Sequence, residues 1–354
     1  MQNVITVSGS AHEQGVRQGE ALRELIAKNV VCVKESLAKS GVDMDFYRAY
    51  MARNAKFMED NNPNLTQEIE GIARGSGLPL DDILALNIPA YFLTRYFGQE
   101  CSMLLARGAA TADGCTYLIK NRDMSTWIEQ AVIKRALDSV ELVEISGAGT
   151  VTYPANGMNS HGLALATTGF WSDAARPDLA DADTAHIFVN IRILLEECRT
   201  VRDVLERLKA YPRMNGLNII AADRDEAVVI ETTRDTLHVQ RDDGSGILYR
   251  TNHYLSPDIA HLNPPESEYP STFLRHARIG RMLAQCGRKL RFQDLWRVMS
   301  DHEDGVNGIC RHPREEAPAW TASTSMVVLE DLEAFTSLGN PCRSLRRAKL
   351  SEKR

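Results

Sequence analysis

Cysteine is the strongest nucleophile among the side chains of this sequence, and two cysteines lie in motifs that could position a reactive thiol. Cys101 follows Gly98-Gln99-Glu100 and begins a predicted strand, whereas Cys115 lies in Asp113-Gly114-Cys115-Thr116. The ordinary alternative for either residue is a small buried core position, which free cysteine often fills. Asp113-Gly114 is a hairpin-turn signal, so we expect Cys115 to be only the first residue of the returning strand.

Three polar clusters farther along the chain could assist such a nucleophile. The hairpin would return Asn121-Arg122-Asp123 to the strand start that carries Cys101, where Asp123 could orient an amine. Asn252, at a predicted strand end, could donate to an oxyanion, and Arg311 could bind a carboxylate. Taken singly, each cluster is explained as well by a strand terminator or a satisfied structural polar group.

Two histidines leave a second catalytic arrangement open. His253 follows Asn252 directly, and His312 follows Arg311 directly. Either histidine could form a Cys–His dyad with a nucleophilic cysteine, and the sequence alone does not decide this point.

The elements that must position these residues fall into two regimes. Up to about residue 95 the pattern is helical after one short strand at 3–7, and Ser10 and Glu13 have capping-box spacing for a helix reaching about residue 39. From Cys101 onward, short strands with turn signals alternate with pairs of helices. The strands are expected at 101–110, 115–120, 142–152 and 162–167, in a meander at 217–222, 227–231, 236–240 and 247–251, and at 323–329 and 334–337. This order predicts an α+β fold with a boundary near residue 100.

Composition and spacing exclude several classes of function. The net charge is −6 and the pI is about 5.9, which argues against a nucleic-acid partner. No CxxC pair or Cys/His cluster has zinc-site spacing, so we expect no metal site. A glycine-rich phosphate loop is also absent, because Gly15 and Gly19 lie in a helical pattern and fit close helix packing. Neither a secretory signal nor a run of roughly 18 apolar residues is found, so we expect a cytoplasmic protein without a membrane partner.

The clusters together resemble the peptidase C45 group of N-terminal-nucleophile (Ntn) hydrolases, which includes acyl-coenzyme A:6-aminopenicillanic acid acyltransferase. The resemblance runs from Gly9 to about Cys342. It is carried by the common order and spacing of several motifs: Gly15 and Gly19, Glu68-Ile69-Glu70-Gly71-Ile72-Ala73-Arg74-Gly75, Leu86-Asn87, Asn121-x-Asp123, Gly157-Met158-Asn159-Ser160-x-Gly162-Leu163-Ala164, Thr251-Asn252-His253 and Ile309-Cys310-Arg311.

The resemblance implies a four-layer αββα sandwich in which two antiparallel sheets lie face to face behind a helical leader. It also implies self-cleavage between Glu100 and Cys101. Residues 1–100 would then form one chain and residues 101–354 the other, both in one folded unit. The family's nucleophile falls on Cys101, its amine-orienting Asp on Asp123, its oxyanion-hole Asn on Asn252 and its active-site Arg on Arg311. Cys115 lies too near Asp123 in the chain to replace Cys101.

This assignment implies a self-activating amidohydrolase with a small-molecule N-acyl substrate. Cleavage would free the α-amine of Cys101, whose pKa of about 7.7–8.0 suits a general base, and turnover would pass through an S-acyl enzyme. No cofactor is expected, although a coenzyme A thioester could be a substrate. The expected partner is the cleaved leader itself, and the sequence does not determine any higher oligomer.

Departures from the family pattern keep alternatives open. Glu100 stands where the fungal enzyme has Gly. Thr168 also differs from the residue of the fungal enzyme, and this difference could alter the substrate pocket. We expect Thr168, Phe170, Trp171 and His253 to line that pocket. The rival activity is an acyltransferase that passes the acyl group to an amine. An alternative of another class is an unprocessed scaffold without catalysis.

Overall fold

The computed structural model of the protein describes most of the chain, namely residues 3–88, 99–124, 128–152, 156–169, 191–210, 216–233, 235–314 and 319–350. Helices that belong to these residues are all too short or too polar to span a membrane.

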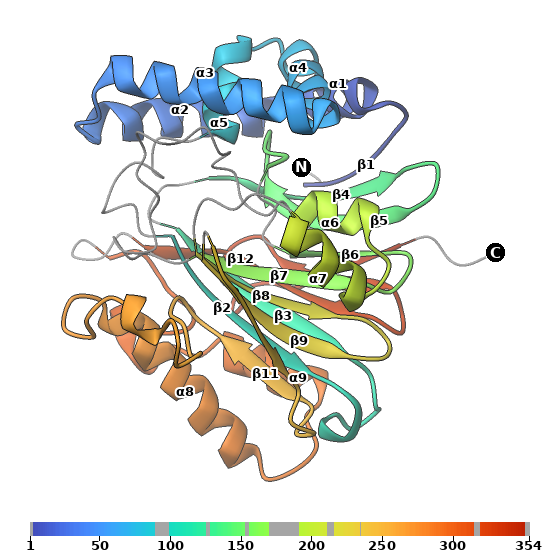
Figure 1. Ribbon diagram of the computed structural model, residues 1–354, viewed down its shortest axis with the longest axis vertical. Coiled ribbons are helices and arrows are strands. Elements are labelled where there is room, and N and C mark those ends of the chain that lie inside the picture. Colours follow the sequence, from blue (N-terminus) through green and yellow to red (C-terminus); the bar gives the residue numbers. More distant parts are fainter. Residues whose placement is uncertain are drawn as a thin grey trace.

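The described strands form two sheets (Figure 1). The larger sheet contains, in spatial order, β1 (Val4–Ser8), β4 (Gln130–Ala136), β5 (Glu141–Gly147), β6 (Asn156–Asn159), β7 (Ala164–Gly169), β8 (Leu217–Ala222), β9 (Ala227–Thr232) and β10 (Leu237–Arg241). The smaller sheet contains β11 (Ile247–Arg250), β2 (Gln99–Ala106), β3 (Tyr117–Met124), β12 (Trp320–Val328), β13 (Glu333–Ser337) and β14 (Arg346–Lys349).

The two sheets pack face to face and are covered by helices on their outer faces. Alternate residues of the strands, such as Met103 on β2 and Ile145 on β5, fill one core between the sheets. α6 (Ile191–Glu197) and α7 (Val201–Ala210) pack on the outer face of the larger sheet, while α8 (Pro270–Cys286) and α9 (Phe292–Met299) pack on that of the smaller sheet. The predicted four-layer αββα sandwich of the α+β class is therefore confirmed (Figure 1).

A helical leader forms a separate layer at one end of this sandwich (Figure 1). It comprises α1 (Ala11–Ala21), α2 (Arg23–Lys39), α3 (Met44–Asn61), α4 (Pro63–Ser76) and α5 (Leu80–Asn87). The predicted capping box is present, since the Ser10 side chain accepts from the Glu13 backbone and the Glu13 carboxylate accepts from Ser10. The prediction of a single helix up to residue 39 is wrong in one respect, because the helix is interrupted at Leu22. The side chain of Leu22 is buried in the core of the leader.

Four glycines explain how α1 and α4 pack so closely. A Cβ atom on Gly15 would lie 2.1 Å from the Glu68 carbonyl oxygen, and one on Gly75 would lie 2.1 Å from the Val16 carbonyl oxygen. Gly19 and Gly71 meet the opposite helix backbone in the same way. Close packing, the role expected of Gly15 and Gly19, is thus confirmed.

Two details of the sheets differ from expectation. The strand of the leader, β1, pairs parallel with β4, so the larger sheet is mixed at its edge rather than wholly antiparallel. β2 and β3 do form the predicted antiparallel hairpin, but a short 3-10 helix at Gly108–Ala110 lengthens the connection beyond a tight turn. The pairing places Arg122 opposite Cys101 and Asp123 opposite Glu100. Other 3-10 helices cover Ala260–Leu262 and Gly305–Asn307.

Candidate functional site

The backbone around Cys101 is held by side chains from two distant segments. Cys101 lies near the start of β2, and the residue is only 6% exposed. Its backbone N–H donates to Asn252 Oδ1 at 2.9 Å, and its carbonyl oxygen accepts from the Arg275 guanidinium of α8. Asn252 follows β11, which pairs with β2, and therefore the sheet itself brings the amide to Cys101.

The thiol of Cys101 lies on the face of β2 that is directed between the two sheets. Side chains alternate along a strand, so Cys101 shares this face with Met103, and Lys120 lies opposite Met103 on β3. Lys120 is buried, and the Cys101 side chain lies close enough to act on its pKa. Burial lowers the pKa of Lys120 to about 8, against the opposing effect of Cys101 beside it. A lysine that titrates near neutral pH thus faces the sulfur.

Glu100 points to the opposite face, toward α8, and is clamped there as an ion. Its carboxylate lies 2.6 Å from Arg275 Nη2 and 2.7 Å from Arg311 Nη1, and it accepts from Ser271 Oγ at 2.5 Å. Burial opposes ionisation of this carboxyl, but Arg275 and Arg311 hold its pKa below the usual value. Arg311 therefore does bind a carboxylate, and in the intact chain that carboxylate belongs to Glu100.

Asp123 lies beside Glu100 on the same face of the hairpin and is fully buried. Its Oδ1 accepts from Thr321 Oγ1 at 2.7 Å, and the same hydroxyl oxygen accepts from the backbone N–H of Arg311 at 2.8 Å. Within the described part of the chain, Asp123 Oδ2 has no hydrogen-bond partner. Burial raises the pKa of Asp123 to about 6, although Arg311 and Arg275 act in the other direction. Asp123 thus holds a spare buried acceptor close to the Glu100–Cys101 peptide.

Asn252 is fixed on all sides by hydrogen bonds. Its Nδ2 donates to the Gly169 carbonyl oxygen at 2.6 Å, and its backbone N–H donates to Thr272 Oγ1 at 2.7 Å. Its Oδ1 accepts from Arg275 Nη2 at 3.0 Å in addition to Cys101. An amide group carries two N–H donors, and the bond to Gly169 uses one of them.

The residues expected to line a substrate pocket have structural partners where they are described. Thr168 Oγ1 donates to the Thr251 carbonyl oxygen, which ties the end of β7 to the Asn252 segment. His253 lies 2.9 Å from Thr272 Oγ1 through Nδ1 and stacks on Phe273 with ring centroids 4.4 Å apart. Burial, followed by His276 and Arg275, lowers the pKa of His253 to about 3, so the ring is neutral. Phe170 and Trp171 lie outside the described residues.

The other sulfur and imidazole candidates are held elsewhere. Cys115 precedes β3 at the end remote from Asp123, and burial raises the pKa of its thiol to about 11. His312 contacts His302, Cys310 and Cys342, and the hydrogen bonds of the described residues join neither His312 nor His253 to Cys101. The geometry thus gives no support to a Cys–His dyad that uses Cys101, although His312 does lie beside two other cysteines.

Sequence reasoning missed Lys120, Arg275 and Ser271. Lys120 could have been found from the hairpin register, because it follows the apolar Leu118 on the face of β3 that corresponds to the Cys101 face of β2. Arg275 and Ser271 lie one turn apart on α8, and only the packing of that helix on β2 brings them to Glu100.

Comparison with known proteins gives this geometry a context. Residues 110–342 match the family described as acyl-coenzyme A:6-aminopenicillanic acid acyl-transferase, a stretch that contains Asp123, Asn252 and Arg311 but begins after Cys101.

Among solved structures, the chain is similar to a variant of conjugated bile acid hydrolase from Clostridium perfringens, with 16% identity, 70% of this chain and 92% of that chain covered, and a TM-score of 0.50. Another mutant of that hydrolase matches with 16% identity, 71% and 92% coverage and a TM-score of 0.49. Penicillin V acylase from Agrobacterium tumefaciens matches with 14% identity, 67% and 83% coverage and a TM-score of 0.45. At 16% identity, the first of these matches concerns the fold alone.

Proposed function

The chain belongs to the acyl-coenzyme A:6-aminopenicillanic acid acyl-transferase family of Ntn amidohydrolases and acyltransferases, and from this premise we propose that it is a self-processing cysteine amidohydrolase whose nucleophile is Cys101. Its substrate class is a linear N-acyl amide, and its acyl intermediate is a thioester on Cys101.

One observation carries the proposal: the Glu100–Cys101 peptide unit is held on both sides of its C–N bond. Asn252 binds the nitrogen of that bond, and Arg275 with Arg311 fixes the side chain of the residue that supplies its carbonyl. Lys120 faces the sulfur of the next residue. A buried core cysteine would need none of these polar partners.

Self-cleavage follows from this arrangement by an N-to-S acyl shift. The Cys101 thiol gives its proton to the neutral amine of Lys120, and the sulfur attacks the carbonyl carbon of Glu100. The C–N bond breaks as the nitrogen takes up a proton, leaving a thioester to Glu100 and a free α-amine. Water then hydrolyses the thioester. This step releases the leader with a new C-terminal α-carboxylate on Glu100 and regenerates the thiol. Lys120 stabilises the thiolate that makes the attack.

Turnover of substrate repeats the acyl transfer with a new base. The freed α-amine, with a pKa of about 7.7–8.0, accepts the thiol proton and returns it to the leaving amine. Asp123 Oδ2, a buried acceptor with no partner among the described residues, receives a hydrogen bond from that amine. The second N–H of the Asn252 amide donates to the oxyanion. Water hydrolyses the S-acyl enzyme and completes the cycle.

Acyl transfer is the second candidate, and the name of the matched family favours it. The S-acyl enzyme is common to both activities, and an acceptor amine would replace water in the last step. The acyl donor would then be an amide or a coenzyme A thioester.

Product analysis separates these candidates. Wild-type protein is incubated with a panel of N-acyl amides and acyl thioesters, with and without an acceptor amine, beside Cys101→Ala and the matched control Cys115→Ala. We expect free acid from wild type and from Cys115→Ala and none from Cys101→Ala. Transfer is the main activity if the acceptor amine diverts most of the acyl group into a new amide. Equal turnover by Cys101→Ala would overturn the proposal, and an inactive, uncleaved wild type would favour the scaffold.

A further inference from the structure

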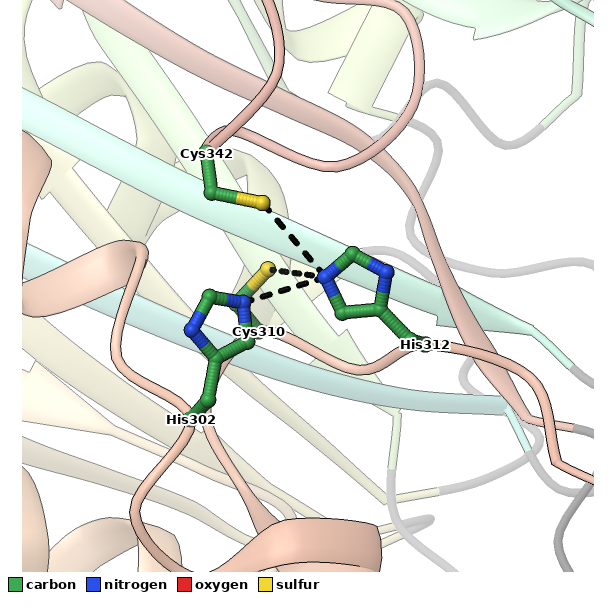
Figure 2. A group of neighbouring side chains, drawn as sticks. All are labelled: His302, Cys310, His312 and Cys342. Atoms are coloured by element: carbon green, nitrogen blue, oxygen red, sulfur yellow. Dashed lines mark hydrogen bonds between the residues drawn. The ribbon is translucent and has the colours of Figure 1, made fainter.

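Four potential metal-binding side chains converge in one cluster (Figure 2), and two of them flank Arg311 in the sequence. His302, Cys310 and His312 come from the segment between α9 and β12, and Cys342 comes from the turn after β13. Their donor atoms all lie within 4.8 Å of one another. Zinc-site spacing was not evident in the sequence, because Cys342 is far from the other three in the chain and only the fold joins them.

The distances inside this cluster are close to those around one tetrahedral ion. His302 Nε2 lies 3.0 Å from His312 Nε2, and His312 Nε2 lies 3.4 Å from Cys342 Sγ and 3.9 Å from Cys310 Sγ. A zinc ion with ordinary bond lengths separates two nitrogens by about 3.3 Å and a nitrogen from a sulfur by about 3.6 Å. Shifts of a few tenths of an ångström would therefore bring these pairs to coordination distances.

We propose that His302, Cys310, His312 and Cys342 bind one Zn²⁺ ion in a closed, structural Cys₂His₂ site. Two thiolates balance the charge of a divalent cation, and mixed imidazole and thiolate donors suit zinc in tetrahedral geometry. The mutual proximity of all four donor atoms fits a single ion. Four protein ligands leave no position for a substrate, so the site is structural.

Neighbouring groups support one ligand and must adjust around another. Asn340 Nδ2 donates to Cys310 Sγ at 3.6 Å and also to the Arg311 carbonyl oxygen, which orients the sulfur. Arg343 Nη2 lies 3.4 Å from His312 Nδ1. Since metal on Nε2 leaves the proton on Nδ1, this exposed guanidinium must turn away on binding.

The consequence for the enzyme lies in the position of Arg311. This residue stands between two of the ligands, and its guanidinium binds Glu100 at 2.7 Å. Zinc would join the segment that carries Arg311 to the turn after β13 and so fix the arginine relative to the peptide before Cys101. The site is distinct from the proposed nucleophile and stands whether or not the chain cleaves itself.

Metal binding is tested on the full-length protein under reducing conditions. Wild type, Cys342→Ser, His302→Gln and the control Cys286→Ser are stripped with chelator, reloaded with zinc or cobalt(II), and desalted. Metal content, competition with a chromophoric chelator and the cobalt visible spectrum are recorded, with circular dichroism to confirm folding. Cys342 and His302 are both exposed, and therefore their replacement should leave the fold intact.

We expect one zinc ion per chain in wild type and in Cys286→Ser, with the cobalt bands of a tetrahedral thiolate site. Cys342→Ser and His302→Gln should weaken zinc binding by more than about tenfold. Three results would overturn the proposal: wild type that retains no metal, zinc affinity equal to that of wild type in both ligand variants, or recovery of Cys310 and Cys342 as a disulfide in protein that still binds no metal after reduction.

Discussion

At the residue scale, Asn252 illustrates how one amide can serve two steps. Its Oδ1 accepts from the Cys101 nitrogen, whereas its Nδ2 retains a hydrogen beyond the one given to Gly169. The acceptor half holds the nitrogen of the proposed cleavage site, and the donor half is the proposed contact with the oxyanion. The two halves can be separated by substitution.

Asn252→Asp keeps an acceptor oxygen for Cys101 but removes the N–H donor. Loss of one oxyanion donor commonly lowers kcat by about 10²–10³. We therefore expect Asn252→Asp and Asn252→Ala to lose turnover to a similar degree in steady-state assays of fully processed protein. Near-normal kcat in Asn252→Asp would remove the donor role from Asn252.

Asp123 should make stability depend on pH in an unusual direction. Its pKa is raised by burial to about 6 from an ordinary value near 3.8, so the native state binds the proton more tightly than the unfolded state. Its contribution to the free energy of unfolding is therefore fully present below about pH 4 and is lost as the pH rises through about 6, by up to about 3 kcal/mol.

Chemical denaturation at several pH values checks this sign. Because cleavage would complicate unfolding, Cys101→Ala is compared with Cys101→Ala/Asp123→Asn. The difference in unfolding free energy between the two proteins should change between pH 4 and pH 6 and be flat below that range. A difference independent of pH would show that Asp123 titrates normally.

The site could be predicted from the sequence only in part. Family motifs pointed to Cys101, Asp123, Asn252 and Arg311, and the fold brings all four to the Glu100–Cys101 peptide. The clamp on Glu100 was not foreseen, because Arg275 lies on a helix whose packing no local pattern specifies. Thr168 and His253 were assigned to a pocket, yet their side chains are occupied by structural hydrogen bonds.

At the scale of elements, local signals worked where they were strong. The Ser10 capping box and the β2–β3 hairpin were anticipated from short motifs. The break at Leu22 and the parallel pairing of β1 were not, since both depend on contacts between segments distant in sequence.

The contact between α1 and α4 allows a sharp test of packing. Gly71→Ala would place a Cβ atom 2.2 Å from the His12 carbonyl oxygen, although alanine favours helix by about 1 kcal/mol over glycine. Overpacking against backbone typically costs about 1–3 kcal/mol, so we expect a net loss of stability on thermal or urea unfolding. Glu70→Ala, an exposed change on the same helix, is the control and should stay within about 0.5 kcal/mol of wild type. Increased stability in Gly71→Ala would contradict the close approach.

At the scale of the whole molecule, a buried network of ion pairs joins the helical leader to the αββα sandwich. Glu68 on α4 lies 2.6 Å from Arg135 on β4 and 3.0 Å from Arg192 on α6, and Arg135 also contacts Glu144 at 2.7 Å. All four side chains are at most 4% exposed. Together with the β1–β4 pairing, this network would keep the two chains associated after cleavage.

Glu68→Gln should weaken that association. Removing one partner of a buried ion pair typically costs about 3–5 kcal/mol, and here Arg135 and Arg192 would keep Glu144 but lose the second fully buried carboxylate. We expect the cleaved leader to dissociate at lower urea than in wild type, as followed by size-exclusion chromatography, while the exposed control Glu70→Gln behaves as wild type. Equal dissociation midpoints for Glu68→Gln and wild type would assign the association to other contacts.

Intact-mass spectrometry of purified wild type, Cys101→Ala and Cys115→Ala tests the central claim most directly. The account predicts two chains meeting at Glu100 and Cys101 in wild type and in Cys115→Ala, and one full-length chain in Cys101→Ala. A wild-type protein that stays whole, or a Cys101→Ala protein that is still cut at that bond, would contradict it.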